Sequence, residues 1–203
     1  MTELVLVRHG ETEWNRVGRV QGRSDIPLND TGREQARETG RRLADGAFDA
    51  VVASPLSRAA ETARIIAGEL DPVGDVELID DLVERDYGGA EGMTGAQIDE
   101  AYDGKLVARE TRRATVQRVE PALLHLAARY PGQRVLVVSH GGVIGSLVRH
   151  VTRWAWPERG ARIDNGSDHV FRVEDGRLRL VSSAGRDWSD ELLPAEEPVD
   201  TDE

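Results

Sequence analysis

The chain has no cysteine, and several other residue types are scarce among its 203 residues. Without cysteine there are no disulfides, cysteine-ligated zinc, iron–sulfur clusters or cysteine nucleophiles. Aromatic residues make up 4% of the chain, which leaves few rings for stacking on nucleic-acid bases. No apolar run approaches the ~18 residues needed to cross a membrane, and the N-terminus lacks the pattern of a signal peptide. These absences predict a cytoplasmic enzyme or binding domain.

Positive charge is scarce as well. There are 26 basic residues against 37 acidic ones, which gives a formal net charge of -11, and Lys105 is the single lysine. An acidic chain repels phosphate backbones and anionic lipids, so we expect neither a nucleic-acid nor a membrane partner. The oligomeric state is left open, as monomer or homodimer.

The length suits one domain, which we place at residues 1–188. Residues 189–203 contain proline and acidic residues but no basic residue, and we expect this tail to be disordered. Seven acidic residues lie in it: Asp190, Glu191, Glu196, Glu197, Asp200, Asp202 and Glu203. The body of the chain is therefore only mildly acidic.

Short apolar runs alternate with helical patterns. Residues 4–7, 50–53, 76–79 and 135–138 have the composition of buried strands. Asp175 and Gly176 lie between two alternating runs and predict a hairpin. This alternation predicts an α/β layered fold with a mostly parallel sheet and at least one antiparallel strand.

Three details of the helices are also predicted. Thr31 and Glu34 form a capping-box pattern at one helix start, and Ser57 is placed to cap the next helix. Pro121 interrupts a long apolar stripe and predicts a kink or a broken start. The stripe consists of Val116, Val119, Leu123, Leu126 and Tyr130. A short buried helix is expected from Val143 to Val151.

Polar residues follow the predicted strands at their carboxyl ends, where ligands bind in open α/β sheets. These candidates are Arg8 and His9, Arg58, Glu84 and His140. Two guanidiniums at one point favour a bidentate oxyanion such as phosphate. A neutral imidazole is a competent nucleophile toward phosphorus, a protonated second imidazole would stabilise charge, and a carboxylate can supply and remove a proton. This chemistry needs no metal and no cofactor.

Each candidate has a plainer interpretation. His9 alone is as easily structural as functional, and Glu84 competes with Asp80, Asp81 and Asp86 for the acid role. A cation on the first helical turn opposes the helix dipole, so the position of Arg58 favours function. We read His125, His150 and His169 as structural or surface residues. No Gly-x-Ser-x-Gly motif supports Ser54, Ser57 or Ser139 as a serine nucleophile.

In these segments the chain resembles the histidine phosphatase superfamily, also called phosphoglycerate mutase-like. The matching segments follow the family order over about residues 3–183: Arg8 to Asn15, Gln21-Gly22, Ser54 to Ala59, Leu82 to Gly88, and Ser139 to Gly142. The resemblance implies a three-layer α/β/α sandwich around a mixed, mostly parallel sheet. The tail lies outside the match.

The resemblance also implies roles for individual residues. His9 would be the nucleophile that becomes phosphorylated, and Glu84 the general acid and base. Arg8, Arg58 and His140 would form the phosphate pocket. Other positions would line the phosphate or the substrate: Asn15, Gln21, Gly22, Tyr87 and Gly141.

Three functions stay open at this point. We favour a metal-independent phosphomonoester hydrolase acting on a small phosphorylated metabolite, because residues 89–115 are shorter than the insertion of the true mutases. Arg112 and Arg113 resemble a helix start rather than the paired arginine of those mutases. Residues 84–87 do resemble the mutase segment, so a 2,3-bisphosphoglycerate-dependent phosphoglycerate mutase is the alternative. A non-catalytic phosphate-binding module is disfavoured because all five core residues are present.

Overall fold

The computed structural model describes residues 1–71, 73–103, 108–154, 156 and 162–188. The acidic tail predicted for residues 189–203 lies outside these residues. Within the described residues, no helix combines the length and the apolar character needed to span a membrane.

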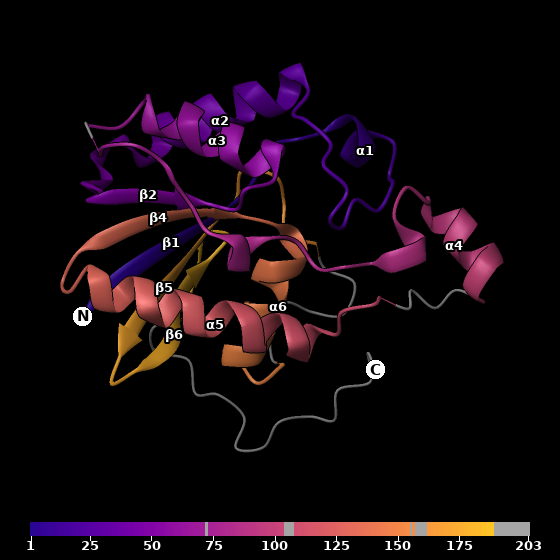
Figure 1. The fold of residues 1–203 in the computed structure, drawn as a ribbon. Helices are drawn as coiled ribbons and strands as arrows, with labels where there is room; N and C mark the ends of the chain where they lie inside the picture. Colours follow the sequence, from indigo (N-terminus) through magenta and orange to yellow (C-terminus); the bar gives the residue numbers. More distant parts are fainter. Residues whose placement is uncertain (72, 104–107, 155, 157–161, 189–203) are drawn as a thin grey trace.

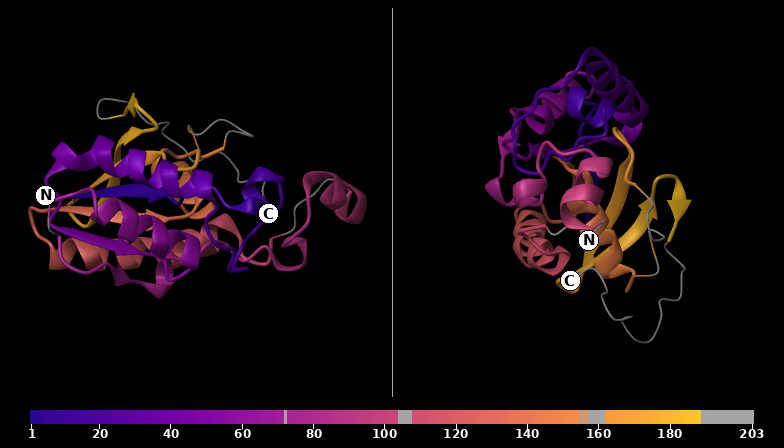
Figure 2. Two further views of the ribbon diagram at one scale, coloured as in Figure 1. Left: turned by 90° about the horizontal axis from the view of Figure 1, so that it is seen from above. Right: turned by 90° about the vertical axis from the view of Figure 1, so that its right-hand side faces the viewer.

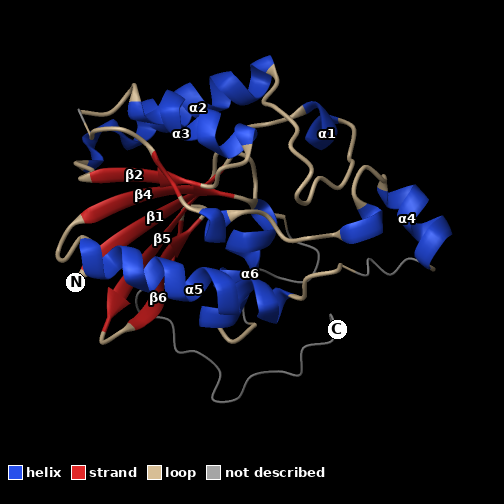
Figure 3. Ribbon diagram, viewed as in Figure 1, coloured by secondary structure: helices blue, strands red, loops and turns tan. Residues whose placement is uncertain are grey.

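A mixed seven-stranded sheet forms the centre of the molecule, in the order β3-β2-β4-β1-β5-β6-β7 (Figures 1 and 3). The strands are β1 (Thr2–Arg8), β2 (Ala50–Ala53), β3 (Glu77–Leu78), β4 (Arg134–Ser139), β5 (Asp168–Glu174), β6 (Arg177–Ser183) and β7 (Arg186–Asp187). Neighbours from β3 to β1 pair in parallel, whereas β5 pairs antiparallel with both β1 and β6. The four predicted parallel strands and the predicted hairpin are therefore confirmed.

Helices cover both faces of the sheet, which gives the expected α/β/α layering. The main helices are α2 (Asp30–Leu43), α3 (Ser57–Ala67), α5 (Arg112–Arg129) and α6 (Gly141–Val151). Helices α2 and α3 lie on one face, and α5 and α6 lie on the other (Figures 1 and 2). Two short helices, α1 (Glu13–Arg16) and α4 (Gly95–Tyr102), lie beyond the sheet, toward the carboxyl ends of the parallel strands. Single 3₁₀ turns span Ala44–Gly46, Asp80–Leu82 and Gly88–Ala90.

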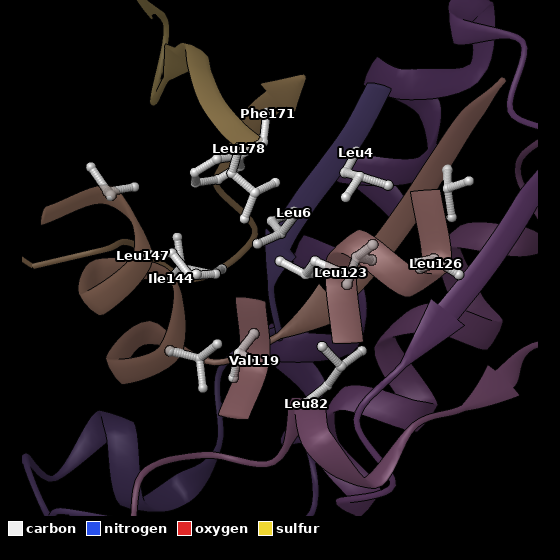
Figure 4. Packing of buried hydrophobic residues seen from close by; sticks show 14 of the residues in the cluster. Leu4, Leu6, Leu82, Val119, Leu123, Leu126, Ile144, Leu147, Phe171 and Leu178 are labelled. Carbon is white, nitrogen blue, oxygen red and sulfur yellow. The ribbon is translucent and has the colours of Figure 1, made fainter. Parts of the chain in front are cut away.

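The alternation of side chains along β1 divides the core into two parts. Leu4 and Leu6 pack with Leu123 of α5 and Leu147 of α6 (Figure 4). Val5 and Val7 face the opposite way and pack with Ala59, Ala63 and Ile66 of α3. Because β1, β2 and β4 are buried on both faces, their sequences are continuously apolar instead of alternating.

Two predicted helix caps are wrong. Asn29 caps α2 by accepting a hydrogen bond from the backbone N–H of Gly32, so Thr31 lies inside the first turn. Ser57 is the first residue of α3, and its backbone N–H and its hydroxyl both donate to Asp25 Oδ1 at 2.8 Å. The acceptor at α2 is thus Asn29, two residues before Thr31, and the acceptor at α3 is Asp25 on another loop.

Pro121 does not break its helix. Helix α5 begins nine residues earlier at Arg112 and continues through the proline to Arg129. The predicted stripe is buried at Val116, Val119, Leu123 and Leu126, and this tertiary packing offsets the lost backbone hydrogen bond. The predicted helix start at Arg112 and the buried helix α6 are both confirmed.

Candidate active site

A pocket of about 430 Å³ lies at the carboxyl edge of the parallel strands. Every residue predicted for the site lines it except His140. Arg8 ends β1, His9 follows it, Arg58 lies in the first turn of α3, and Glu84 follows the 3₁₀ turn after β3. The topology therefore brings together residues that are up to 76 positions apart in the chain.

His9 is 2% exposed, and its environment fixes the ring tautomer. The Nδ1 atom lies 2.7 Å from the carbonyl oxygen of Gly10, which can only accept, so Nδ1 carries the proton. The Nε2 atom accepts from Arg58 Nε at 3.2 Å. Burial, with Arg58 and Arg8, holds the pKa of His9 well below its usual range. The ring is thus neutral near pH 7, with its lone pair on Nε2.

The two site arginines are held by backbone carbonyls. Arg58 is fully buried and donates to the carbonyl oxygens of Gly22 and Ser24 at 2.8 Å, and Arg8 donates to the carbonyl of Ile163. Burial lowers the pKa of both guanidiniums, while Glu84 opposes this shift. Neither arginine is neutralised by a salt bridge among the described residues, so their positive charge faces the pocket.

His140 lies behind His9, with the two ring centroids 5.2 Å apart in an edge-to-face arrangement. Burial, together with Arg58, His9 and Arg8, keeps the pKa of His140 well below its usual range. The structure therefore favours a neutral ring, unlike the protonated second imidazole considered from the sequence. Its Nδ1 atom is buried and has no hydrogen-bond partner among the described residues.

Ser54 and His140 form a hydrogen bond of 2.8 Å, the pairing that a serine nucleophile would need. Both residues are 0% exposed, and Ser54 does not line the pocket. The Ser54 hydroxyl also accepts from the backbone N–H of Leu56 at 3.3 Å. Ser54 is therefore placed to orient His140 and does not form part of the pocket wall.

Glu84 is 8% exposed and accepts three backbone hydrogen bonds. Two of them come from the first turn of α6, from Gly142 at 3.0 Å and Val143 at 3.1 Å, and the third from Arg85 at 2.8 Å. The carboxylate thus lies at the positive end of the helix dipole. A Cβ at position 142 would lie 2.4 Å from Glu84 Oε1, so only glycine permits this approach.

The competing acids do not reach the pocket. Asp80, Asp81 and Asp86 are absent from its lining, whereas Glu84 is part of it. Tyr87 follows on the same segment, and burial, with a contribution from Glu84, raises its pKa to about 12. The phenol is therefore a hydrogen-bond donor at neutral pH.

The remaining predicted residues form one rim of the pocket. Gln21 Oε1 accepts from the Thr12 hydroxyl at 2.8 Å, and Asn15 closes a capping box with Thr12 at the start of α1. Gly22 has φ +55°, and a Cβ there would lie 2.0 Å from Glu91 Oε1. Gly22 is therefore restricted both by its backbone conformation and by the close approach of Glu91.

Several contributors to the site were given no site role in the sequence analysis. Gly10 and Gly32 approach so closely that a Cβ at Gly10 would lie 2.2 Å from the carbonyl oxygen of Gly32. Thr62 accepts from the N–H of Gly10 at 3.1 Å, and Asn165 donates to the carbonyl of His9 at 2.8 Å. Four further arginines line the pocket: Arg19, Arg112, Arg149 and Arg162. The i, i+4, i+8 spacing of Gly141, Gly145 and Arg149 could have placed Arg149 on the pocket face of α6.

The three histidines read as structural or surface residues do not line the pocket. His169 is buried between two serine hydroxyls, while His125 and His150 are exposed. Among the described residues, no three acidic or histidine side chains gather in a way that could hold a metal ion. Fold and pocket together define an α/β protein with an arginine-rich pocket at the carboxyl edge of its parallel strands.

Comparison with known proteins gives a narrower class. Residues 4–184 match the model of the histidine phosphatase superfamily, branch 1. An uncharacterized phosphatase PhoE of Bacillus subtilis is 44% identical over 183 residues, covering 88% of this chain and 93% of the relative. A probable phosphoglycerate mutase GpmB of Salmonella paratyphi A is 35% identical, covering 90% of this chain and 89% of the relative.

Among solved structures, a mycobacterial glucosyl-3-phosphoglycerate phosphatase in complex with VO3 superimposes with a TM-score of 0.81. It is 29% identical and covers 90% of this chain and 98% of its own. The chain belongs to the histidine phosphatase superfamily, branch 1. It is a phosphomonoesterase of that family, which acts on small phosphorylated substrates.

Proposed function

We propose that the protein hydrolyses a phosphate monoester through a phosphohistidine intermediate on His9, without a metal ion. The observation that carries this proposal is the fixed tautomer of His9. Nδ1 donates to the carbonyl of Gly10 at 2.7 Å, and the lone pair on Nε2 lies beside Arg58 in the pocket. A neutral, oriented imidazole is an activated nucleophile for phosphorus.

In the first step, the Nε2 lone pair of His9 forms a bond to phosphorus, and the bond from phosphorus to the ester oxygen breaks. The departing alcohol takes a proton from the carboxyl group of Glu84. Arg8 and Arg58 hold the phosphoryl oxygens, whose charge they balance in a buried site. Bidentate guanidinium contacts also fix the direction of attack.

In the second step, water attacks the phosphohistidine. Glu84 takes a proton from the attacking water, the bond between phosphorus and Nε2 breaks, and inorganic phosphate leaves. His9 recovers its lone pair, and Glu84 recovers its proton. The same carboxyl group thus acts first as an acid and then as a base.

His140 supports both steps as a neutral ring. When the Ser54 hydroxyl donates to Nε2, the proton of His140 lies on Nδ1, the buried atom without a partner among the described residues. Nδ1–H can then donate to the phosphoryl group.

The substrate we propose is a small phosphorylated metabolite. The pocket of about 430 Å³ fits a molecule of that size, and the related mycobacterial enzyme is a glucosyl-3-phosphoglycerate phosphatase. Arg112, at the start of α5, and Gly22 line its walls, and we expect the segments that carry them to set specificity. A mutase activity is the second candidate, because the GpmB relative has that name.

The test uses His9→Ala with p-nitrophenyl phosphate as substrate. We expect turnover to fall by about 10⁴-fold or more while the circular dichroism spectrum is unchanged, since the nucleophile is lost without a change in fold. Activity of the unaltered protein should survive excess EDTA. Turnover by His9→Ala, or a strict need for added Mg²⁺, would remove the proposed mechanism.

The mutase alternative is tested by product analysis. The protein is incubated with 3-phosphoglycerate and a catalytic amount of 2,3-bisphosphoglycerate, and the products are followed by ³¹P NMR. A hydrolase releases inorganic phosphate alone. Formation of 2-phosphoglycerate would instead identify a mutase.

A further inference from the structure

We propose that Glu110 and Arg118 are positioning residues that hold Glu84 in place for proton transfer. This inference rests on the proposed role of Glu84. Glu110 immediately precedes the N-cap of α5, and Arg118 lies two turns into that helix. Neither residue lines the pocket, so both act through the segment that carries Glu84.

The two side chains form a bidentate ion pair. Arg118 Nε donates to Glu110 Oε1 at 3.0 Å, and its NH2 group donates to Oε2 at 3.1 Å. The side chains are 18% and 12% exposed, so solvent screens the pair only partly. A bidentate pair fixes the relative orientation of both groups, which a single contact does not.

Arg118 binds the chain on the N-terminal side of Glu84. Its NH1 group donates to the carbonyl oxygen of Asp81 at 2.5 Å and to that of Val83 at 3.1 Å. All three nitrogens of one guanidinium are therefore engaged, by one carboxylate and two carbonyls.

Glu110 binds the chain on the C-terminal side of Glu84. Its Oε2 accepts from the backbone N–H of Asp86 at 3.1 Å, its N–H donates to the carbonyl of Asp86 at 3.0 Å, and its carbonyl accepts from Arg85 at 3.1 Å. Residues 81–83 and 85–86 are thus tied to one ion pair, and Glu84 lies between them.

The direction of the Glu84 side chain depends on this arrangement. Its carboxylate reaches the N–H groups of Gly142 and Val143 only if its backbone stays close to the start of α6. The segment has no regular structure of its own: a 3₁₀ turn precedes it, and residues 83–87 belong to no helix or strand. Loss of the ion pair between Glu110 and Arg118 would move the proton donor, and a misplacement of about 1 Å is enough to cost ~10²-fold in rate.

The experiment compares two substrates of nearly the same shape. Phenyl phosphate has a poor leaving group that needs a proton, whereas p-nitrophenyl phosphate has a good one that does not. The ratio of their kcat/KM values reports the proton transfer and cancels common effects on binding and folding. Glu84→Gln is the reference, and we expect it to lower kcat/KM for phenyl phosphate by about 10²–10⁴-fold, with a much smaller loss for p-nitrophenyl phosphate.

For Arg118→Met we expect the same selective effect, but a smaller one: kcat/KM for phenyl phosphate should fall by about 10–100-fold, with a much smaller loss for p-nitrophenyl phosphate. Glu110→Gln keeps the shape of the side chain and can still accept from Asp86, so it should give a smaller selective loss in a folded protein. Arg118→Lys keeps the charge but not the bidentate geometry, and it should recover part of the activity on phenyl phosphate.

Arg134→Met is the matched control. Arg134 also pairs with a glutamate, Glu3 at 2.8 Å, and with a backbone carbonyl, that of Gly46 at 2.7 Å, but it lies at the amino end of β4. Its loss should lower the melting temperature and leave the substrate ratio unchanged. If Glu84→Gln changes the ratio while the Arg118 and Glu110 variants behave like Arg134→Met, the ion pair of Glu110 and Arg118 stabilises the fold but does not position Glu84. If Glu84→Gln itself leaves the ratio unchanged, the role of Glu84 fails instead.

Discussion

The parallel and antiparallel halves of the sheet each contain buried histidine. His9 and His140 follow β1 and β4 in the parallel half, and His169 lies in β5 in the antiparallel half. All three are at most 2% exposed, and burial lowers the pKa of each ring, that of His169 to about 4. Burial therefore does not distinguish the site from the rest of the core.

The neighbours of the rings make the difference. Both nitrogens of His169 are satisfied by serine hydroxyls, Ser167 at 3.0 Å and Ser183 at 2.8 Å. In contrast, His9 presents Nε2 to the guanidinium of Arg58, and Nδ1 of His140 has no partner in the described part of the chain. A ring nitrogen that accepts from a cation, or that has no partner, marks a reactive site, whereas a ring held on both sides by hydroxyls marks a structural one.

The largest effect in this comparison is expected from Arg58→Gln. This substitution removes the cation that distinguishes the surroundings of His9 from those of His169. The fall in kcat/KM for p-nitrophenyl phosphate should be about 10²–10³-fold, because a preorganised contact to the phosphoryl oxygens is lost. The pKa of His9, followed by NMR, should rise, since Arg58 contributes to its lowering. Arg33→Gln, in the partly buried ion pair with Glu61 outside the pocket, is the control and should change kcat/KM by less than about twofold. Loss of less than tenfold in Arg58→Gln would contradict the role of Arg58.

A smaller effect is expected from Gly142→Ala, which tests the approach of Glu84 to α6. The new Cβ would meet Glu84 Oε1 at 2.4 Å and the Tyr87 hydroxyl oxygen at 2.7 Å, so the carboxylate must move. We expect kcat to fall by about 10–100-fold.

Gly145→Ala is its control on the same helix. The nearest atom to its Cβ would be Ile163 Cγ1 at 3.7 Å, an ordinary contact. Alanine there should leave kcat within about twofold and stabilise the helix by about 0.5–1 kcal/mol. Equal losses of activity in the two variants would show that Glu84 does not depend on glycine at position 142.

The smallest effect on activity is expected at His169, whose contribution is to stability. Its pKa is about 4 in the folded protein, against 6.5 for an ordinary histidine. Between these two values the unfolded chain binds a proton that the folded protein does not, so acidification favours unfolding. The free energy of unfolding should fall by up to about 3 kcal/mol from this residue as the pH drops from 6.5 to 4.

His169→Gln removes this contribution. Urea denaturation at pH 7 and pH 5 should show a shallower pH dependence in the variant, while kcat at pH 7 stays within about twofold. The remaining slope is expected from His9 and His140, whose pKa values are lowered too. A variant with the same slope as the unaltered protein would show that His169 is not buried in its neutral form.

Much of the fold follows from patterns that can be recognised in the sequence. Strands such as residues 4–7 are buried on both faces, so a continuous apolar run identifies them. The convergence of Arg8, His9, Arg58 and Glu84 follows from the rule that parallel strands end at one edge. The helix starts at Asp30 and Ser57 were predicted less well, because their caps depend on Asn29 and on a distant loop.

Other features of the site have no local signal. The contact between Gly10 and Gly32 joins two loops that meet only in the folded chain. The ion pair of Glu110 and Arg118 likewise depends on the packing of α5 against the segment with Glu84. The neutral state of His140 depends on burial and on neighbouring cations, which a sequence does not display.

The most direct test of the account is to trap the phosphorylated enzyme. The protein is mixed with a phosphate monoester, quenched in alkali within milliseconds, digested and analysed by mass spectrometry. We expect a phosphoryl group on the peptide that contains His9, formed and lost at rates compatible with turnover and absent from His9→Ala. Phosphorylation of another side chain, or turnover without any phosphorylated enzyme, would contradict the account.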